Sequence, residues 1–245
     1  MGAGVDQLFR DPNLPKQAKI CRIVDKQLST AMNEFLLALI MNHLRGLNSY
    51  KKDQTQGKWL PRPYLLIQDV RIGIMGMGQL GQSLAQNLIA LGFKVSGWSN
   101  SKKNIPGVKS YAGSTDLPGF LNQTDILICL LPLTNKTRGM LNKKTFVQLP
   151  KNAFIINVAR GDHLVEGDLI EFIDTGHLSG AALDVFSKEP LPQEHPFWGH
   201  PKIHITPHIA SITNPESVAP QILENLRRMK GGLPLLNEVS REKGY

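Results

Sequence analysis

"RIGIMGMGQLGQSLAQNLIALG" (71–92) joins a short apolar run, a glycine-rich turn and a helical pattern within one stretch of chain. A G-x-G-x-x-G turn between a strand and a helix is typical of dinucleotide-binding sites. We expect Gly76 to make the tight turn, Gly78 to admit a pyrophosphate, and Gly81 to let the helix pack closely on the strand. The stretch therefore predicts a strand, a phosphate-binding turn and a helix whose N-terminus faces an anion.

The chain after this turn continues the alternation of apolar runs with helical patterns. Further strands are predicted over 94–98, 125–130, 153–158, 180–185 and 202–207. Continuous apolar strands separated by helices indicate a parallel sheet that is covered on both faces. The predicted fold class is therefore α/β, a doubly wound parallel sheet of the Rossmann type.

The segments that flank this sheet have other patterns. Residues 18–24 predict a short strand, and Thr30 is expected to cap an apolar helix over roughly 31–51. Asn214, followed by a proline, is the expected start of a C-terminal helix that ends at Gly231. We divide the chain into an N-terminal segment (1–28), a connecting helix and linker (29–63), a dinucleotide-binding domain (64–213) and a C-terminal helix with its tail (214–245).

Composition narrows the kinds of partner that the protein can have. The net charge is +8, but lysines and arginines are scattered and no basic run or zinc-finger spacing occurs, so small anions are favoured over nucleic acid. The longest apolar runs are far shorter than the roughly 20 residues of a membrane span. Cys21 and Cys129 are too few for a disulfide framework, which favours a reducing cytoplasm. No metal site is expected.

The stretch "GWSNSKK" (97–103) decides which dinucleotide is expected. NAD sites usually carry an acidic residue there, which binds the ribose 2′-hydroxyl. This chain has Ser99, Asn100 and Ser101 instead, followed by Lys102 and Lys103. Hydroxyl and ammonium groups suit a 2′-phosphate, which a carboxylate would repel. We therefore predict that NADP(H) is preferred over NAD(H), although a lysine pair can also be an ordinary solvated loop.

Three polar residues stand at or just after predicted apolar strands: Arg160, Glu189 and His208. Strand carboxyl ends line the ligand crevice of a doubly wound sheet, so these groups are expected to meet there. Each residue alone has a simpler explanation, as a surface ion pair, a turn residue or a bystander imidazole. The three together predict a catalytic site.

The motifs "GMGQLG" (76–81), "INVARG" (156–161), "GAALDVFSKEPLPQEHPFW" (180–198) and "TPHIA" (206–210), in this order, resemble the D-isomer-specific 2-hydroxyacid dehydrogenases. Within that family, the stretch 97–113 and the start "GAGVD" (2–6) are most similar to the A-type glyoxylate/hydroxypyruvate reductases, which prefer NADPH. Asn100 departs from that group, which often has an arginine there.

The resemblance implies a role for each motif. His208 would donate the proton to a small 2-oxo acid, Glu189 would orient the imidazole, and Arg160 would bind the substrate carboxylate. Ala3 and Gly4, in the opening loop, would also contact substrate, together with Arg160 and His208. The coenzyme contacts that it implies are Gly76, Met77, Gly78, Gln79, Leu80, Gly81, Trp98, Ser99, Asn100, Ser101, Lys102, Lys103, Leu131, Pro132, Val158, Ala159, Arg160, Asp184 and His208.

The resemblance also implies a longer chain. Family members carry most of a flavodoxin-like substrate domain ahead of the loop that matches residues 2–6, so residues 1–28 would be its remnant and the C-terminal helix would return toward it. Three hypotheses remain open: an NADPH-dependent 2-oxo acid reductase, a catalytically silent dinucleotide-binding module, and an interaction protein that senses NAD(P)H. The apolar helix near 31–51 predicts a homodimer, because such a helix needs burial and its counterpart in the family packs across a two-fold axis.

Overall fold

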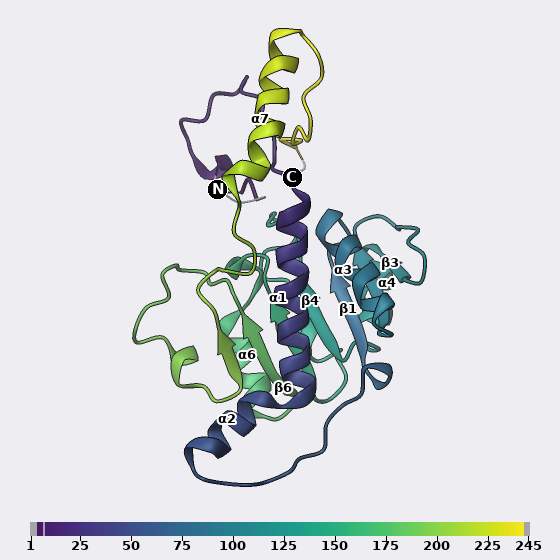
Figure 1. The fold of residues 1–245 in the computed structure, drawn as a ribbon, viewed down its shortest axis with the longest axis vertical. Coiled ribbons are helices and arrows are strands. Elements are labelled where there is room, and N and C mark those ends of the chain that lie inside the picture. Colours follow the sequence, from purple (N-terminus) through teal and green to yellow (C-terminus); the bar gives the residue numbers. More distant parts are fainter. Residues whose placement is uncertain (1–3, 7, 243–245) are drawn as a thin grey trace.

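The structure, a computed structural model, describes residues 4–6 and 8–242. Within these residues, seven parallel strands form one sheet in the order β3-β2-β1-β4-β5-β6-β7 (Figure 1). The order reverses between β1 and β4, which is the point where doubly wound sheets bind dinucleotides. The strands are β1 (Arg71–Met75), β2 (Lys94–Ser99), β3 (Lys109–Ala112), β4 (Ile126–Cys129), β5 (Ala153–Asn157), β6 (Leu178–Leu183) and β7 (Ile203–Ile205).

Helices cover both faces of this sheet. Those on the described chain are α1 (Lys26–Arg45), α2 (Leu47–Thr55), α3 (Gln79–Ala90), α4 (Gly113–Leu121), α5 (Lys143–Phe146), α6 (Glu166–Asp174) and α7 (Pro215–Lys230). Short 3-10 turns lie at Leu8–Arg10, Ile67–Asp69, Gly161–His163 and Pro196–Gly199.

Alternate strand residues supply the two cores. Along β4, Ile126 and Ile128 pack with α1 and α3, whereas Leu127 and Cys129 pack with α4, α5 and α6. Side chains of successive strand residues point to opposite faces, so an all-apolar strand fills both cores. The prediction of a parallel sheet covered on both sides is confirmed. Cys129 is fully buried, and burial raises the pKa of its thiol to about 12.

The first helix differs from its prediction. It begins at Lys26 and not at 31, because the Asp25 carboxylate accepts the Gln27 amide at 3.1 Å and caps it. Thr30 lies inside the helix, where its hydroxyl donates to the Lys26 carbonyl at 3.1 Å, so the predicted cap is wrong. Gly46, with a φ of 60°, ends α1 and separates it from α2.

Two strand predictions also need correction. Residues 18–24 form no strand and contribute only one bridge, between Cys21 and Glu238. The edge strand β3 was not predicted, because its four residues are half-buried or exposed and carry no apolar run. The other predicted strands occur with both ends within two residues of the expected ones.

The described N-terminal and C-terminal segments meet in a small lobe, which we define as residues 4–6, 8–24 and 215–240. The Arg22 amide donates to the Asn237 carbonyl at 3.0 Å, and the Val239 amide donates to the Ile20 carbonyl at 2.8 Å. The Gln221 side chain bonds the main chain at both Arg22 and Val24. Figure 1 shows α7 and the N-terminal segment side by side, apart from the sheet and joined to it by the start of α1 and by the chain between β7 and α7.

The C-terminal end of α1 holds a half-buried histidine, His43, whose titration makes the free energy of unfolding depend on pH. His43 stacks on Phe154 with ring centroids 3.9 Å apart, and burial, aided by His204, lowers its pKa from 6.5 to about 4. Between about pH 6.5 and 4, His43 is therefore protonated in the unfolded chain but remains neutral in the folded chain. The free energy of unfolding consequently falls as the pH drops toward 4. We expect a loss of roughly 3 kcal/mol over this window.

Chemical denaturation at several pH values tests this expectation. His43→Phe keeps the stacked ring but removes the titration, so its unfolding free energy should fall less steeply between pH 6.5 and 4 than that of the wild type. Some slope should remain, because burial also lowers the pKa of His204. Parallel slopes for the two proteins would contradict the assignment.

Candidate active site

The glycine-rich turn between β1 and α3 has the geometry that a bound pyrophosphate requires. Gly76 has a φ of 108°, which side chains rarely tolerate. A Cβ at Gly81 would lie 2.1 Å from the Gly76 carbonyl oxygen, so strand and helix approach too closely for a side chain there. A Cβ at Gly78 would meet nothing within 4 Å, so the space before the first turn of α3, at Gln79 and Leu80, is open. These residues fit a dinucleotide whose phosphates lie at the helix N-terminus.

Several of the expected coenzyme contacts have side chains that pack in the core. Met77 is 2% exposed, and its sulfur would lie 2.5 Å from a Cβ at Gly97. The Trp98 indole donates to the Gly113 carbonyl at 2.8 Å. Their side chains thus support the turn. Leu131, Val158 and Ala159 are also buried, at the exits of β4 and β5.

The carboxyl end of β2 carries no acidic side chain. Ser99 is half-buried, and its hydroxyl donates to the Ser101 carbonyl at 2.8 Å, which shapes the turn. Asn100 and Lys102 are exposed, and Lys103 is half-buried. A ligand that extends beyond the end of β2 would therefore contact hydroxyl, amide and ammonium groups, and no carboxylate from residues 99–103.

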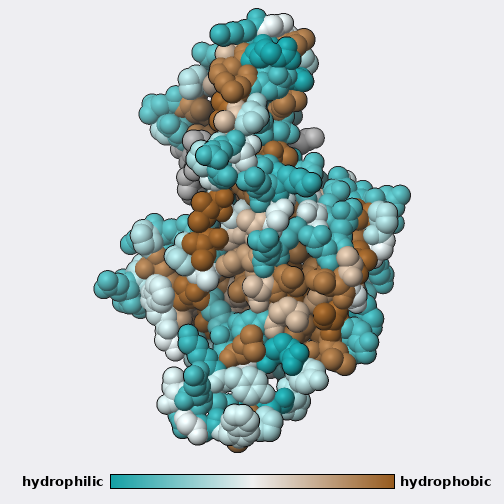
Figure 2. Space-filling view, viewed as in Figure 1, coloured by the Kyte–Doolittle hydropathy of each residue, from teal (hydrophilic) through white to brown (hydrophobic). Residues whose placement is uncertain are grey.

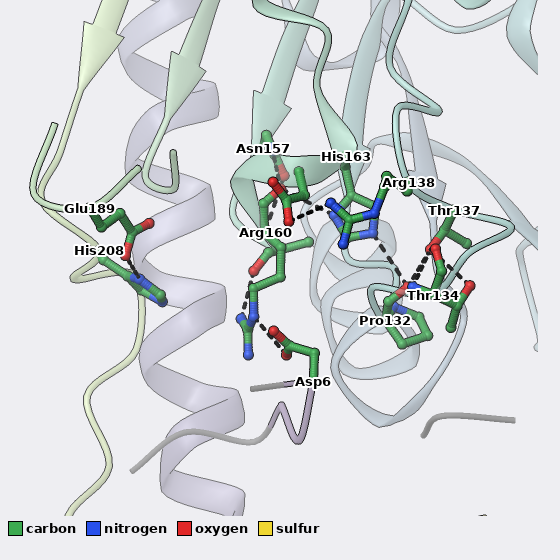
Figure 3. Close-up of polar contacts among 12 residues, drawn as sticks. Asp6, Pro132, Thr134, Thr137, Arg138, Asn157, Arg160, His163, Glu189 and His208 are labelled. Atoms are coloured by element: carbon green, nitrogen blue, oxygen red, sulfur yellow. Dashed lines mark hydrogen bonds and ion pairs between the residues drawn. The ribbon is translucent and has the colours of Figure 1, made fainter. Parts of the chain in front are cut away.

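Glu189 and His208 are hydrogen-bonded to each other beyond the ends of β6 and β7 (Figure 3). The His208 Nδ1 lies 2.8 Å from one Glu189 carboxylate oxygen, and the other oxygen accepts the Phe186 amide at 2.9 Å. The carboxylate is thus fixed on one side by the main chain and holds the imidazole on the other. His208 has a φ of 55°, an unusual conformation for a residue with a side chain and one that clusters at functional sites.

Asp184 anchors the loop that carries His208. It is fully buried, and its carboxylate accepts the Thr206 hydroxyl at 2.6 Å and the amides of Ile209 and Ala210 at 3.0 and 2.8 Å. These bonds hold the main chain on both sides of His208. The aspartate thereby contributes to the placement of the imidazole, in addition to the coenzyme contact that the resemblance implies.

Arg160 follows β5, and its guanidinium is held on two sides (Figure 3). Nε donates to the Asp6 carboxylate at 2.9 Å, and Nη1 donates to the Ala159 carbonyl at 2.7 Å. A Cβ at Gly4 would lie 1.7 Å from Nη2, so Gly4 lies directly against the guanidinium. Of the other expected substrate contacts, Ala3 lies outside the described residues. Figure 3 shows Arg160 and the Glu189–His208 pair on the same side of the sheet, beyond the strand ends.

Two residues of this site were not singled out from the sequence. Asp6 lies 154 positions from the arginine that it binds, so no local pattern could connect them. Gly161 follows Arg160, and a Cβ there would lie 1.8 Å from the Phe186 carbonyl carbon. The loops of Arg160 and Glu189 thus touch through their main chains. The glycine in "INVARG" was the available signal for this close approach.

Among the described residues, no group of three or more potential metal ligands comes together. No helix of residues 4–6 and 8–242 is both long and apolar enough to cross a membrane.

Residues 37–210 match the family model described as "D-isomer specific 2-hydroxyacid dehydrogenase, NAD binding domain". A glyoxylate/hydroxypyruvate reductase A from Yersinia enterocolitica is 42% identical over 250 residues, which cover 100% of this chain and 80% of that protein.

Two solved structures are similar throughout. A D-isomer specific 2-hydroxyacid dehydrogenase from Xanthobacter autotrophicus Py2, in complex with NADPH and MES, has a TM-score of 0.95 and 40% identity, and the match covers 99% of this chain and 100% of that one. The NADPH-dependent glyoxylate/hydroxypyruvate reductase of Sinorhizobium meliloti, in complex with NADP and sulfate, has the same TM-score of 0.95 and 40% identity, over 100% of this chain and 78% of that one. The family match spans all seven strands of the sheet and includes Arg160, Glu189 and His208. The chain belongs to the family of D-isomer-specific 2-hydroxyacid dehydrogenases.

Proposed function

We propose that the protein is an NADPH-dependent reductase of small 2-oxo acids, with glyoxylate and hydroxypyruvate as substrates. The observation that carries the proposal is the Glu189–His208 pair, with 2.8 Å between ring nitrogen and carboxylate, on the same sheet edge as Arg160. The names of the relatives from Yersinia enterocolitica and Sinorhizobium meliloti support this substrate class.

Arg160, His208 and Glu189 have different roles in the reduction. NADPH, when bound, supplies the hydride that reduces the carbonyl carbon. Arg160 binds the substrate carboxylate, a task that suits the two-pronged geometry of a guanidinium. His208 donates a proton from Nε2 to the carbonyl oxygen as negative charge develops there. Glu189 accepts from Nδ1, which sets the tautomer and orientation of the ring.

The same proposal includes the residues that we expect to bind coenzyme and substrate. It also includes the division of the chain into four segments. The open space at Gly78 and the absence of an acidic side chain over residues 99–103 support a site for NADP(H). The small lobe supports the assignment of residues 1–28 and 214–245 to the substrate side. We also propose a cytoplasmic location and no nucleic-acid partner, supported by the two free cysteines and the scattered basic residues.

The alternatives are a silent dinucleotide-binding module and an NAD(P)H-sensing interaction protein. Neither needs a proton donor, so neither accounts for an imidazole held by a carboxylate whose second oxygen the main chain fixes. Steady-state oxidation of NADPH with glyoxylate or hydroxypyruvate separates them from a reductase. We expect substrate-dependent oxidation that yields the 2-hydroxy acid. NADPH binding without turnover would favour the alternatives.

The coenzyme preference gives a second prediction. We expect calorimetric titration to show tighter binding of NADPH than of NADH, because no carboxylate at the end of β2 repels the 2′-phosphate. Lys102→Glu should weaken NADPH binding about tenfold, or 1.4 kcal/mol, and leave NADH binding nearly unchanged. Lys151→Glu, an exposed lysine before β5, is the matched control. Equal affinities for the two coenzymes would contradict the preference.

A homodimer is the third part of the proposal. The arm between α2 and β1, which we define as residues 56–66, exposes large apolar side chains, and Trp59 is 95% exposed. The end of the arm and the neighbouring chain form a groove whose lining is mostly apolar: Met41, Leu44, Arg45, Leu65, Leu66, Ile67, Gln68, Leu91 and Gly92. Figure 2 shows apolar surface where α1 lies in Figure 1. Surfaces of this kind usually contact another chain, and two-fold pairing of identical chains is the commonest arrangement.

Size-exclusion chromatography with light scattering tests the dimer. We expect twice the 27.2 kDa mass of one chain for the wild type. Trp59→Glu should shift the mass toward one chain, because it places a charge in an apolar contact. Trp198→Glu is the control, since Trp198 is 56% exposed but lies outside the arm. A wild-type monomer at all concentrations would contradict the proposal.

A further inference from the structure

His163 is buried between two loops of the site and has no role in the chemistry described above. Its exposed fraction is 0%, in the short turn after β5 (Figure 3). Its Nδ1 lies 3.1 Å from the Arg160 carbonyl oxygen, and its Nε2 lies 3.3 Å from the Pro132 carbonyl oxygen. The ring therefore bridges the loop after β4 and the loop after β5.

Neither carbonyl depends on the imidazole for a donor. The Arg160 oxygen accepts the Asn157 side-chain amide at 2.9 Å and the His163 main-chain amide at 3.2 Å. The Pro132 oxygen accepts the Thr137 hydroxyl at 2.7 Å. Removing the ring would thus leave both carbonyls bonded, so what the imidazole adds is a link between the loops.

Other contacts hold the same two loops together farther from the sheet. Arg138 and Asp162 form an ion pair at 2.6 Å, and the Gly139 amide donates to the Asp162 carbonyl at 2.8 Å. The His163 ring is the link at Pro132, where the β4 loop begins. Burial lowers the pKa of His163, and a neutral imidazole donates from one nitrogen at a time. In the tautomer protonated at Nε2, the ring donates to the Pro132 carbonyl, which is the contact that joins the two loops, and Nδ1 faces the Arg160 carbonyl of its own loop without a hydrogen bond.

The two residues that His163 contacts are expected to bind different ligands. Pro132 is an expected contact of the coenzyme, whereas Arg160 is expected to bind the substrate carboxylate. We propose that His163 is a positioning residue that couples coenzyme binding at the Pro132 loop to the placement of Arg160. This inference rests on the proposed function. Coupling of this kind is a ratio of affinities and can be measured without turnover.

Calorimetry with two probes measures the coupling. Oxamate, an unreactive monocarboxylate with an amide in place of the keto carbonyl, is titrated with and without saturating NADPH. The ratio of its two dissociation constants is the coupling factor. We expect oxamate to bind more tightly with NADPH in the wild type, and His163→Leu to reduce the coupling factor about fivefold. NADPH binding in the absence of oxamate should change less than twofold.

Two variants control for loss of packing. His163→Gln retains a side-chain donor and should keep part of the coupling. His177 also lies against two carbonyl oxygens, those of Phe146 and Leu149 at 2.9 and 3.2 Å, but away from the bridged loops. His177→Leu should lower thermal stability and leave the coupling factor unchanged.

The outcomes separate this inference from the proposed function. A wild-type coupling factor in His163→Leu would overturn the inference alone. A wild type that binds neither NADPH nor oxamate would overturn the proposed function and the inference with it. An equal loss of coupling in His177→Leu and His163→Leu would assign the effect to general loosening and also overturn the inference.

Discussion

Replacement of His208 by alanine should lower kcat for hydroxypyruvate by roughly 10²–10⁴-fold, which is the usual contribution of a general acid. NADPH affinity should change little, because the ring is 47% exposed and the main chain around it is held by Asp184. The measurement is steady-state kinetics, with coenzyme titration by calorimetry in parallel.

Glu189→Gln is the companion to this variant. The amide oxygen can still accept the Phe186 main-chain amide, so the loop should keep its conformation. The amide nitrogen would donate to Nδ1 where the carboxylate accepted, so the ring would be held without its negative partner. We expect a loss of kcat smaller than that of His208→Ala. Near-normal turnover of His208→Ala would place the proton donor elsewhere.

Arg160→Met should lower kcat/KM for hydroxypyruvate by roughly 10²–10³-fold, because loss of one partner from a desolvated charge pair costs several kcal/mol. Arg160→Lys keeps the charge but cannot bind a carboxylate through two nitrogens, so it should recover only part of the loss. Arg160→Met also leaves the half-buried Asp6 carboxylate without its guanidinium partner.

The double variant Arg160→Met with Asp6→Asn separates the two effects. If unpaired Asp6 is the cause of any fall in thermal stability, the double variant should regain stability but not kcat/KM. Full activity of Arg160→Met would show that another group binds the substrate carboxylate.

Most of the sheet could be predicted from the sequence, because its central strands are continuous apolar runs. Strand 126–129 is apolar at every position, strand 153–157 is apolar up to Asn157, and the glycine turn fixes where β1 ends. The edge strand β3 could not, since half of its environment is solvent. The start of α1 was missed because Thr30 and Asp25 are both acceptable caps by residue type, and only the Asp25 bond to Gln27 distinguishes them. The end of α1 at Gly46 was also missed, because a single glycine within an apolar helical pattern does not by itself predict that the helix ends there.

The site shows the same division. Arg160, Glu189 and His208 could be singled out because they follow apolar strands whose carboxyl ends meet at one edge. Asp6 and the bridge from His163 to Pro132 could not, because they join segments that only the tertiary structure brings together. Asp184 was expected beside the coenzyme, and its three bonds to residues 206–210 became visible only in the folded chain.

If the protein is a reductase of small 2-oxo acids, the hydride of NADPH is transferred to the carbonyl carbon of the substrate. The most direct test is incubation with hydroxypyruvate and NADPH that carries deuterium at the transferred position, followed by mass spectrometry of the product. The expected product is glycerate with one deuterium on the carbon that bore the keto group, and His208→Ala should yield at least about 100-fold less of it in the same time. Unlabelled glycerate, or no glycerate from a wild type that binds NADPH, would show that the protein is not such a reductase.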